Sequence, residues 1–183
     1  MSFRYEIRLS GEGGQGLVLA GKVLAEAAAI YDDKNATQSQ SYGPEARGGA
    51  SRSEVIISDE DIDYPKATNI DLLLAFTQES CNRYSKDVRN DGIIIIDENA
   101  VTKLPEGSFR IYAVPIIDVA RDKIGRVMVA NIVALGIIAS FIKNVVSEEA
   151  IEAAILSRVP KGTEQLNLNA FQVGLELGKK IAA

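Results

Sequence analysis

The clearest candidate for chemistry is a glycine-rich stretch near the amino terminus, Gly-Glu-Gly-Gly-Gln-Gly at residues 11–16. Gly11, Gly13 and Gly16 have the spacing of dinucleotide-binding loops, and the stretch lies between an expected strand and an expected helix. Glycines let backbone N–H groups approach an anion, and the N-terminus of a helix adds partial positive charge. The stretch could therefore bind an anion, contact another protein, or form only a tight turn.

The other half of a dinucleotide site is missing. An acidic residue should end the next strand, about 20 residues further on, to bind the ribose hydroxyls. Asp32 and Asp33 instead precede the extended stretch at residues 35–40, and Glu12 would repel a pyrophosphate. No Gly-Lys-Ser/Thr follows the glycines, which excludes the P-loop of nucleoside triphosphatases. The glycine stretch is therefore either a purely structural turn or, as an alternative, a loop that binds NAD or FAD. In the second case the chain would be a free-standing oxidoreductase.

A second loop, Tyr-Gly-Pro-Glu-Ala-Arg-Gly-Gly at residues 42–49, combines one proline, three glycines and one base. The base is Arg47, which is either a solvated surface residue or a guanidinium held to bind a carboxylate or phosphate through two hydrogen bonds. In a doubly wound sheet, loops after the carboxyl ends of strands gather at the crevice where ligands bind. The two glycine loops can therefore meet at that crevice.

Two compositional features limit the chemistry of the chain. It has no histidine, the commonest general base near neutral pH and the commonest metal ligand. It has one cysteine, Cys81, so it can form neither an internal disulfide nor a cysteine-ligated iron–sulfur cluster. Cys81 is interpreted as a small, partly buried residue. Asp97, at the end of a buried strand, is interpreted as a turn or rim residue, with the alternative that it lines the crevice; no partner base can be named for it. We expect no catalytic residue, no metal ligand and no bound cofactor in this chain.

These loops must be positioned by alternating strands and helices. We expect strands at residues 5–9, 52–58, 70–76, 92–97 and 110–114, and a polar extended stretch at 35–40. We expect helices at residues 17–30, 79–86, 119–124, 131–143 and 148–157, and a last helix that opens at Asn167 or Asn169. The alternation favours a three-layer α/β fold, Rossmann-like, with a mostly parallel sheet and helices on both faces. Residues 1–183 are expected to form a single domain.

Charge and hydropathy limit the partners. The net charge of −5 and the pI near 4.9 argue against a nucleic-acid or membrane-surface partner. The first residues carry charges where a signal peptide needs an apolar core, and the apolar stretch at 132–142 falls short of the ~20 residues of a membrane span. We therefore expect a cytoplasmic protein.

The two glycine loops together resemble the γ subunit, or γ domain, of 2-oxoacid:ferredoxin oxidoreductases. Residues 11–16, with the helix that follows at 20–27, are similar to the opening of that family, and residues 42–51 are similar to its second signature. The similarity continues through residues 57–65 and 71–75, and Asn131 with Leu135 and Gly136 resembles a later, weaker element. The resemblance covers essentially the whole chain.

The resemblance implies a subunit that is inactive alone, in a complex that converts a 2-oxoacid and coenzyme A to an acyl-CoA and carbon dioxide. The implied partners are the alpha, beta and delta subunits, with ferredoxin receiving electrons from the complex. In the family, thiamine diphosphate lies with the α and β subunits, and iron–sulfur clusters lie on the β and δ subunits. The opening residues 5–11 favour 2-oxoglutarate over pyruvate or branched-chain oxoacids.

The resemblance also implies a role for the glycine loops as contacts with coenzyme A or with a neighbouring subunit. The candidate residues are Gly11, Gly13, Gly14, Gln15, Gly16 and Arg47. A pure scaffold subunit, which touches no ligand, is the remaining alternative.

Overall fold

The computed structural model describes residues 2–43 and 49–183. Its strands are β1 Arg4–Glu12, β2 Asn35–Tyr42, β3 Ala50–Ser58, β4 Ile70–Ala75, β5 Val88–Asp97 and β6 Arg110–Val114. Its α-helices are α1 Leu17–Glu26, α2 Gln78–Tyr84, α3 Ile116–Val119, α4 Ala130–Phe141, α5 Glu148–Arg158 and α6 Glu164–Ala182. Two helices continue as π-helical turns, α1 through Ala27–Tyr31 and α3 through Ala120–Ile124. Within these residues no helix combines the length and hydropathy that crossing a membrane requires.

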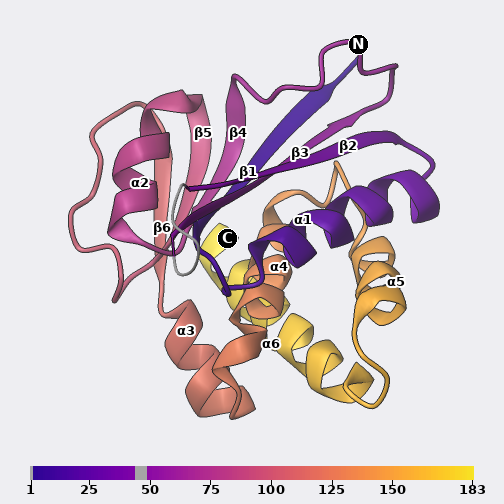
Figure 1. Cartoon of the computed structure of the whole chain (residues 1–183), viewed down its shortest axis with the longest axis vertical. Coiled ribbons are helices and arrows are strands. Elements are labelled where there is room, and N and C mark those ends of the chain that lie inside the picture. Colours follow the sequence, from indigo (N-terminus) through magenta and orange to yellow (C-terminus); the bar gives the residue numbers. More distant parts are fainter. Residues whose placement is uncertain (1, 44–48) are drawn as a thin grey trace.

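The strands form one mixed sheet in the order β2-β3-β1-β4-β5-β6 (Figure 1). The pairs β1–β4, β4–β5 and β5–β6 are parallel, whereas β3 is antiparallel to both β1 and β2. The short connection between β2 and β3 explains the reversal, because a parallel crossover needs a dozen residues or more. The second glycine loop therefore joins the two strands of a β-hairpin.

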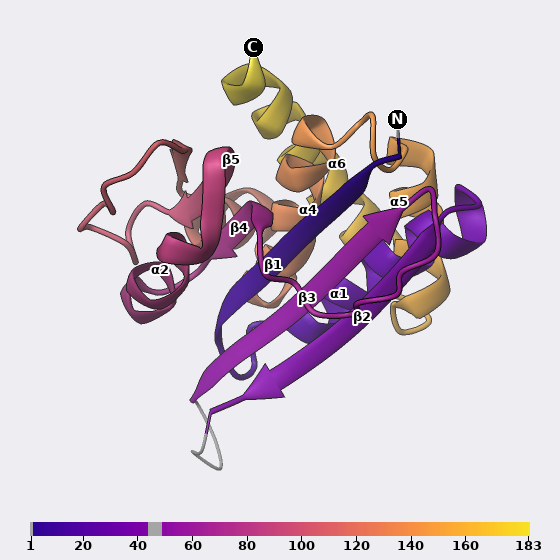
Figure 2. The same ribbon diagram turned by 90° about the horizontal axis from the view of Figure 1, so that it is seen from above.

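Helices cover both faces of the sheet, but unequally. α1, α4, α5 and α6 cover the face from which Ile7, Leu9 and Leu72 project, and they enclose the larger core. α2 covers the opposite face, where Ile56, Leu73 and Ile94 form a smaller core. α2 packs against β1 and β4. In Figure 2, none of the helices of residues 2–43 and 49–183 covers β3 and β2 on this side. The predicted three-layer α/β fold is confirmed.

Close helix packing lies at the centre of the larger core, where α4 and α6 meet through glycines. A Cβ atom placed on Gly174 would come within 2.0 Å of the Val133 carbonyl oxygen. A Cβ atom on Gly136 would come within 2.2 Å of the Phe171 carbonyl oxygen. The two backbones can therefore approach this closely only because both positions lack a side chain.

Several predicted boundaries are wrong at the ends of elements. The helix expected at residues 119–124 already begins at Ile116, as α3. The last helix, α6, begins at Glu164 and not at Asn167 or Asn169. Asn167 lies inside its first turn, where the side-chain amide donates to the Thr163 carbonyl oxygen at 2.9 Å. β1 extends to Glu12, because Gly11 and Glu12 pair with Ser51 and Ala50 of β3. Tertiary pairing thus keeps two residues of the glycine stretch in the strand.

Candidate functional site

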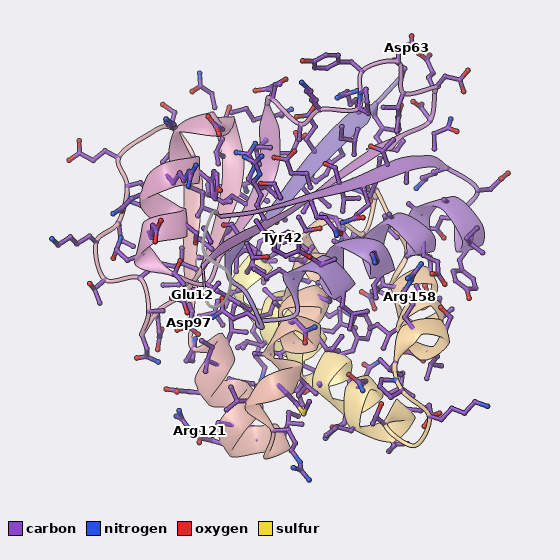
Figure 3. The ribbon with its side chains drawn as sticks, in the orientation of Figure 1. Glu12, Tyr42, Asp63, Asp97, Arg121 and Arg158 are labelled. Atoms are coloured by element: carbon purple, nitrogen blue, oxygen red, sulfur yellow. The ribbon has the colours of Figure 1, made fainter. Side chains whose placement is uncertain are left out.

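The candidate site lies at the edge of the sheet where β1, β2, β4, β5 and β6 end. Figure 3 shows Glu12, Tyr42 and Asp97, the last residues of β1, β2 and β5, at this edge. The chain passes to opposite faces after β1 and β4, because α1 packs on one face and α2 on the other. The edge between these two strands is therefore the switch point at which α/β sheets usually bind ligands.

The turn of the first glycine stretch consists of Gly13, Gly14, Gln15 and Gly16. Gly14 and Gly16 have left-handed backbone angles, with φ of +92° and +75°. The Gln15 side chain folds back, and its Oε1 accepts a hydrogen bond of 2.7 Å from the Glu12 N–H. A Cβ atom on Gly11 would lie 2.3 Å from this oxygen. Gly11 thus makes room for the glutamine that closes the turn.

A buried residue of α4 supports the turn from below. The Asn131 side chain is almost inaccessible to solvent, and its amide donates to the Gly16 carbonyl oxygen at 3.1 Å. Its own Oδ1 accepts from the Ile132 N–H at 2.9 Å, which fixes the orientation of the amide. The sequence analysis named Asn131 only as part of the weaker element of the family resemblance. It did not predict the contact with Gly16, because no local pattern shows that α4 passes beneath the turn.

The N-terminus of α1 has no side-chain cap and no acidic residue in its first turn, so its backbone N–H groups are available to bind an anion. Gly16 occupies the N-cap and has no side chain that could cap the helix, and the first turn of α1 contains no acidic residue. The first backbone N–H groups of a helix lack partners within the helix and favour negative charge. The turn therefore combines an uncapped helix end with glycine backbone that a ligand can approach closely.

The two glycine loops meet in the structure. The Gly13 N–H donates to the Gly49 carbonyl oxygen at 2.8 Å, and the Gly43 N–H donates to the Ala50 carbonyl oxygen at 2.7 Å. The first bond joins the two loops, as expected, whereas the second lies within the β2–β3 hairpin and closes it. The Gly13–Gly49 bond also occupies the Gly13 N–H, which is therefore not free to bind an anion. Arg47 lies outside the described residues.

A small cavity of about 100 Å³ opens beside the turn. Its walls are formed by Gly14, Gln15 and apolar residues from three other segments: Phe76, Ile117, Val127, Met128 and Ala130. Met128 is 78% exposed and Val127 is 49% exposed, so apolar surface continues outward from the cavity. The volume holds about three water molecules. It is too small for a nucleotide and suits a small apolar group or a side chain of a partner protein.

Asp97 is buried in this region, and both oxygens of its carboxylate already accept hydrogen bonds from backbone N–H groups. Its Oδ1 accepts from the N–H groups of Asn99 and Ala100 at 3.1 Å each, and its Oδ2 accepts from the Ile117 N–H at 2.9 Å. The side chain thus ties the end of β5 to the start of α3. Asp97 lies at this edge of the sheet but is not among the residues that line the cavity, and its contacts are those of a structural residue.

The acidic residues near the end of α1 do not complete a dinucleotide site. Asp32 accepts hydrogen bonds from the backbone N–H and the hydroxyl of Ser147, at 2.6 and 2.7 Å. It therefore holds the start of α5, where Ser147 is the N-cap. In addition, β3 lies between β1 and β2, so the end of β2 is not beside the turn as a dinucleotide site requires.

The single thiol is inert by its environment. Cys81 is fully buried in α2, and burial raises the pKa of its thiol. Because the thiolate is the reactive form, this residue is structural. Within the described parts of the chain, no group of three or more acidic or cysteine side chains is arranged to hold a metal ion.

Comparisons with known proteins agree on one family. The family described as "Pyruvate ferredoxin/flavodoxin oxidoreductase" matches residues 6–177. The chain is 49% identical over 183 residues to the 2-oxoglutarate synthase subunit KorC of Methanocaldococcus jannaschii, covering 99% of this chain and 97% of that protein. It is 46% identical over 180 residues to KorC of Methanothermobacter marburgensis, with 95% and 96% covered. Among solved structures, the gamma subunit of a keto/oxoacid ferredoxin oxidoreductase from Geobacter sulfurreducens is similar with a TM-score of 0.85 and 55% identity, covering 98% of this chain and 99% of that one.

Proposed function

The chain belongs to the pyruvate ferredoxin/flavodoxin oxidoreductase family, and we propose that it is the gamma subunit of a 2-oxoglutarate:ferredoxin oxidoreductase. The observation that carries the proposal is similarity over nearly the full length of both chains to subunits named for 2-oxoglutarate synthase. The resemblance of residues 5–11 to the 2-oxoglutarate enzymes points the same way. The proposed reaction converts 2-oxoglutarate and coenzyme A to succinyl-CoA and carbon dioxide, with electrons passing to ferredoxin.

The proposed partners are alpha, beta and delta subunits in the cytoplasm, which would contain the thiamine diphosphate and the iron–sulfur clusters. The described residues of this chain contribute neither histidine nor an accessible cysteine to such a site. Their chemistry suits a subunit that shapes and closes an active site built mainly by its partners. The chain is therefore proposed to act as one part of an enzyme and to be inactive alone.

Within that complex, the joined glycine loops are proposed to contact coenzyme A or the neighbouring subunit. Support comes from the uncapped start of α1, the exposed backbone of Gly14 and the apolar cavity beside it. Gly11, Gln15 and Gly16 would shape the turn, since their contacts lie within it. Gly13 would join the turn to the hairpin. Arg47, placed in the hairpin loop by the sequence, would bind a phosphate or carboxylate.

The proposal is tested by assembling the chain with its candidate partner subunits and assaying oxidation of 2-oxoglutarate with coenzyme A and a viologen dye. We expect turnover by the complex and none by the purified chain. Pyruvate and a branched-chain oxoacid are assayed in the same way, for comparison with 2-oxoglutarate. Turnover by the chain alone, or tight binding of NAD or FAD to it, would refute the proposal in favour of a free-standing oxidoreductase.

The role of Arg47 is tested in the same complex. If the guanidinium binds through two hydrogen bonds, Arg47→Lys should recover little of the activity lost in Arg47→Ala, because an ammonium group cannot reproduce the paired contact. The measurement is kcat and the KM for coenzyme A in both variants. Parent-like assembly and turnover in both would show Arg47 to be a surface residue.

A further inference from the structure

The β2 edge of the sheet lacks the features that usually prevent strand pairing between proteins. β2 has eight residues, Asn35–Tyr42, with no charged residue, proline or glycine among them. It is the outermost strand in Figure 2. The opposite edge strand, β6, has five residues and starts with Arg110. Because natural proteins protect exposed edges with charges, prolines or short strands, β2 is available for pairing with another strand.

The backbone groups that face outward follow from the hairpin. The Gly43 N–H donates to the Ala50 carbonyl oxygen, so every second pair from there exchanges hydrogen bonds between β2 and β3. Those pairs include Ser41–Arg52, Ser39–Glu54 and Thr37–Ile56. The intervening β2 residues therefore turn their N–H and C=O groups away from β3: Ala36, Gln38, Gln40 and Tyr42.

A groove runs along the same edge between β2 and α1. Its walls include Lys22, Ala25, Ala29, Ile30, Ala36 and Gln38. At the end of the helix, Ile30 is 70% exposed and the adjacent Tyr31 is 45% exposed. A single copy of the chain thus leaves apolar side chains in water directly beside an unpaired strand.

We propose that two copies of this chain pair through β2 in antiparallel fashion, with the two-fold axis at Thr37. In this register Ala36 of one copy lies opposite Gln38 of the other, so outward-facing backbone groups meet outward-facing groups. The paired segments carry no charge, so self-pairing opposes no like charges. The two sheets become one continuous sheet, and both α1 helices lie on the same face of it.

The charges on α1 fit the same axis. A Cβ atom on Gly21 would lie 3.5 Å from Cγ of Gln38, which places Gly21 level with Gln38. With a rise of ~1.5 Å per residue in the helix and ~3.4 Å in the strand, Leu24 lies level with Thr37 or Ala36. Lys22 and Glu26 are equally distant from Leu24, on either side. The axis therefore sets Lys22 of one copy toward Glu26 of the other.

The separation of the helices permits this contact. α1 packs chiefly on β3, and the two β3 strands would be three strand spacings apart, about 14 Å. Side chains as long as lysine and glutamate can bridge the space between helices at this distance, and Ile30 and Tyr31 can fill it. Glu26 is already paired with Arg158, so Lys22 of the second copy would give the carboxylate a second cationic neighbour.

Proline substitutions test the pairing by analytical ultracentrifugation of the full chain. Ala36→Pro removes an outward N–H within the proposed contact and leaves the β2–β3 ladder intact, so the dimer should be lost. Gln40→Pro, the matched control, removes an outward N–H beyond the paired segment and should leave the dimer intact. A parent chain that stays monomeric at about 100 μM, above the micromolar Kd of a small interface, would overturn the proposal. Equal loss of the dimer in both variants would also overturn it.

Cysteine cross-linking tests the register. In the proposed dimer the two Thr37 side chains form a non-hydrogen-bonded pair at the axis, where Cβ atoms are close enough for a disulfide. Thr37→Cys should therefore give a covalent dimer under mild oxidation, because native Cys81 is buried and does not compete. Ser41→Cys lies on the same face but away from the axis and should remain monomeric on a non-reducing gel. Cross-linking at Ser41 as efficient as at Thr37 would show the register to be wrong.

Discussion

Glycine is required for different physical reasons in the α4–α6 contact and in the β1–α1 turn. The contact needs the absence of a side chain, and the turn needs a positive φ. In the helix contact, Gly136, Gly174 and Gly178 have no room for a side chain, since a Cβ atom on each would overlap groups of the facing helix. In the turn, Gly14 has open space around it and needs glycine only for its positive φ. The first set is required for packing, whereas Gly14 presents bare backbone at a surface.

The largest effect is expected at the helix contact. Gly174→Ala places a methyl group against the Val133 carbonyl, which is backbone and cannot rotate away. The helices must separate, and we expect a loss of about 3 kcal/mol or more in the free energy of unfolding. Urea denaturation measures this loss. Gly162→Ala is the control, because Gly162 lies in open space and its replacement is opposed only by a positive φ. An equal effect of the two substitutions would contradict the packing explanation.

An intermediate effect on stability is expected at Gly16, which has both a positive φ and no room for a side chain. Gly16→Ala must adopt a φ of +75°, and its methyl group displaces the Asn131 amide that supports the turn. Strain and the lost hydrogen bond together predict a loss of about 2–3 kcal/mol. Asn131→Ala removes the obstructing side chain, so the double variant should lose less stability than the sum of the single variants. Additive losses would show that Asn131 and Gly16 are not coupled.

The smallest effect on stability is expected at Gly14. Gly14→Ala meets no neighbouring atom and is opposed only by its φ of +92°, a cost of about 1–2 kcal/mol. Gly14→Asn should cost less, because asparagine tolerates left-handed angles better than alanine does. If a ligand or subunit approaches this backbone, both variants should raise the KM for coenzyme A or weaken assembly in the complex. Parent-like kinetics in both would place the contact elsewhere and leave Gly14 with a conformational role alone.

Local sequence patterns were sufficient for the order and type of the secondary-structure elements. Ile94, Ile95 and Ile96 predict the buried part of β5, and Ser147 followed by two glutamates predicts the start of α5. These predictions succeed because side-chain period and helix capping act between residues close in the sequence. The absence of histidine and the single cysteine likewise restrict the chemistry of the chain, because composition limits the available side chains in any fold.

Tertiary structure alone decided what the glycine stretch becomes. The pairing of Gly11 and Glu12 with β3 keeps them in the strand, and the Gly13–Gly49 hydrogen bond joins two loops that are far apart in sequence. Asn131 supports the turn because α4 passes beneath it, and Asp32 is engaged because α5 begins beside it. Each of these contacts joins residues that are distant in the sequence. Local pattern carries no information about such partners, because only the packing of the whole chain brings them together.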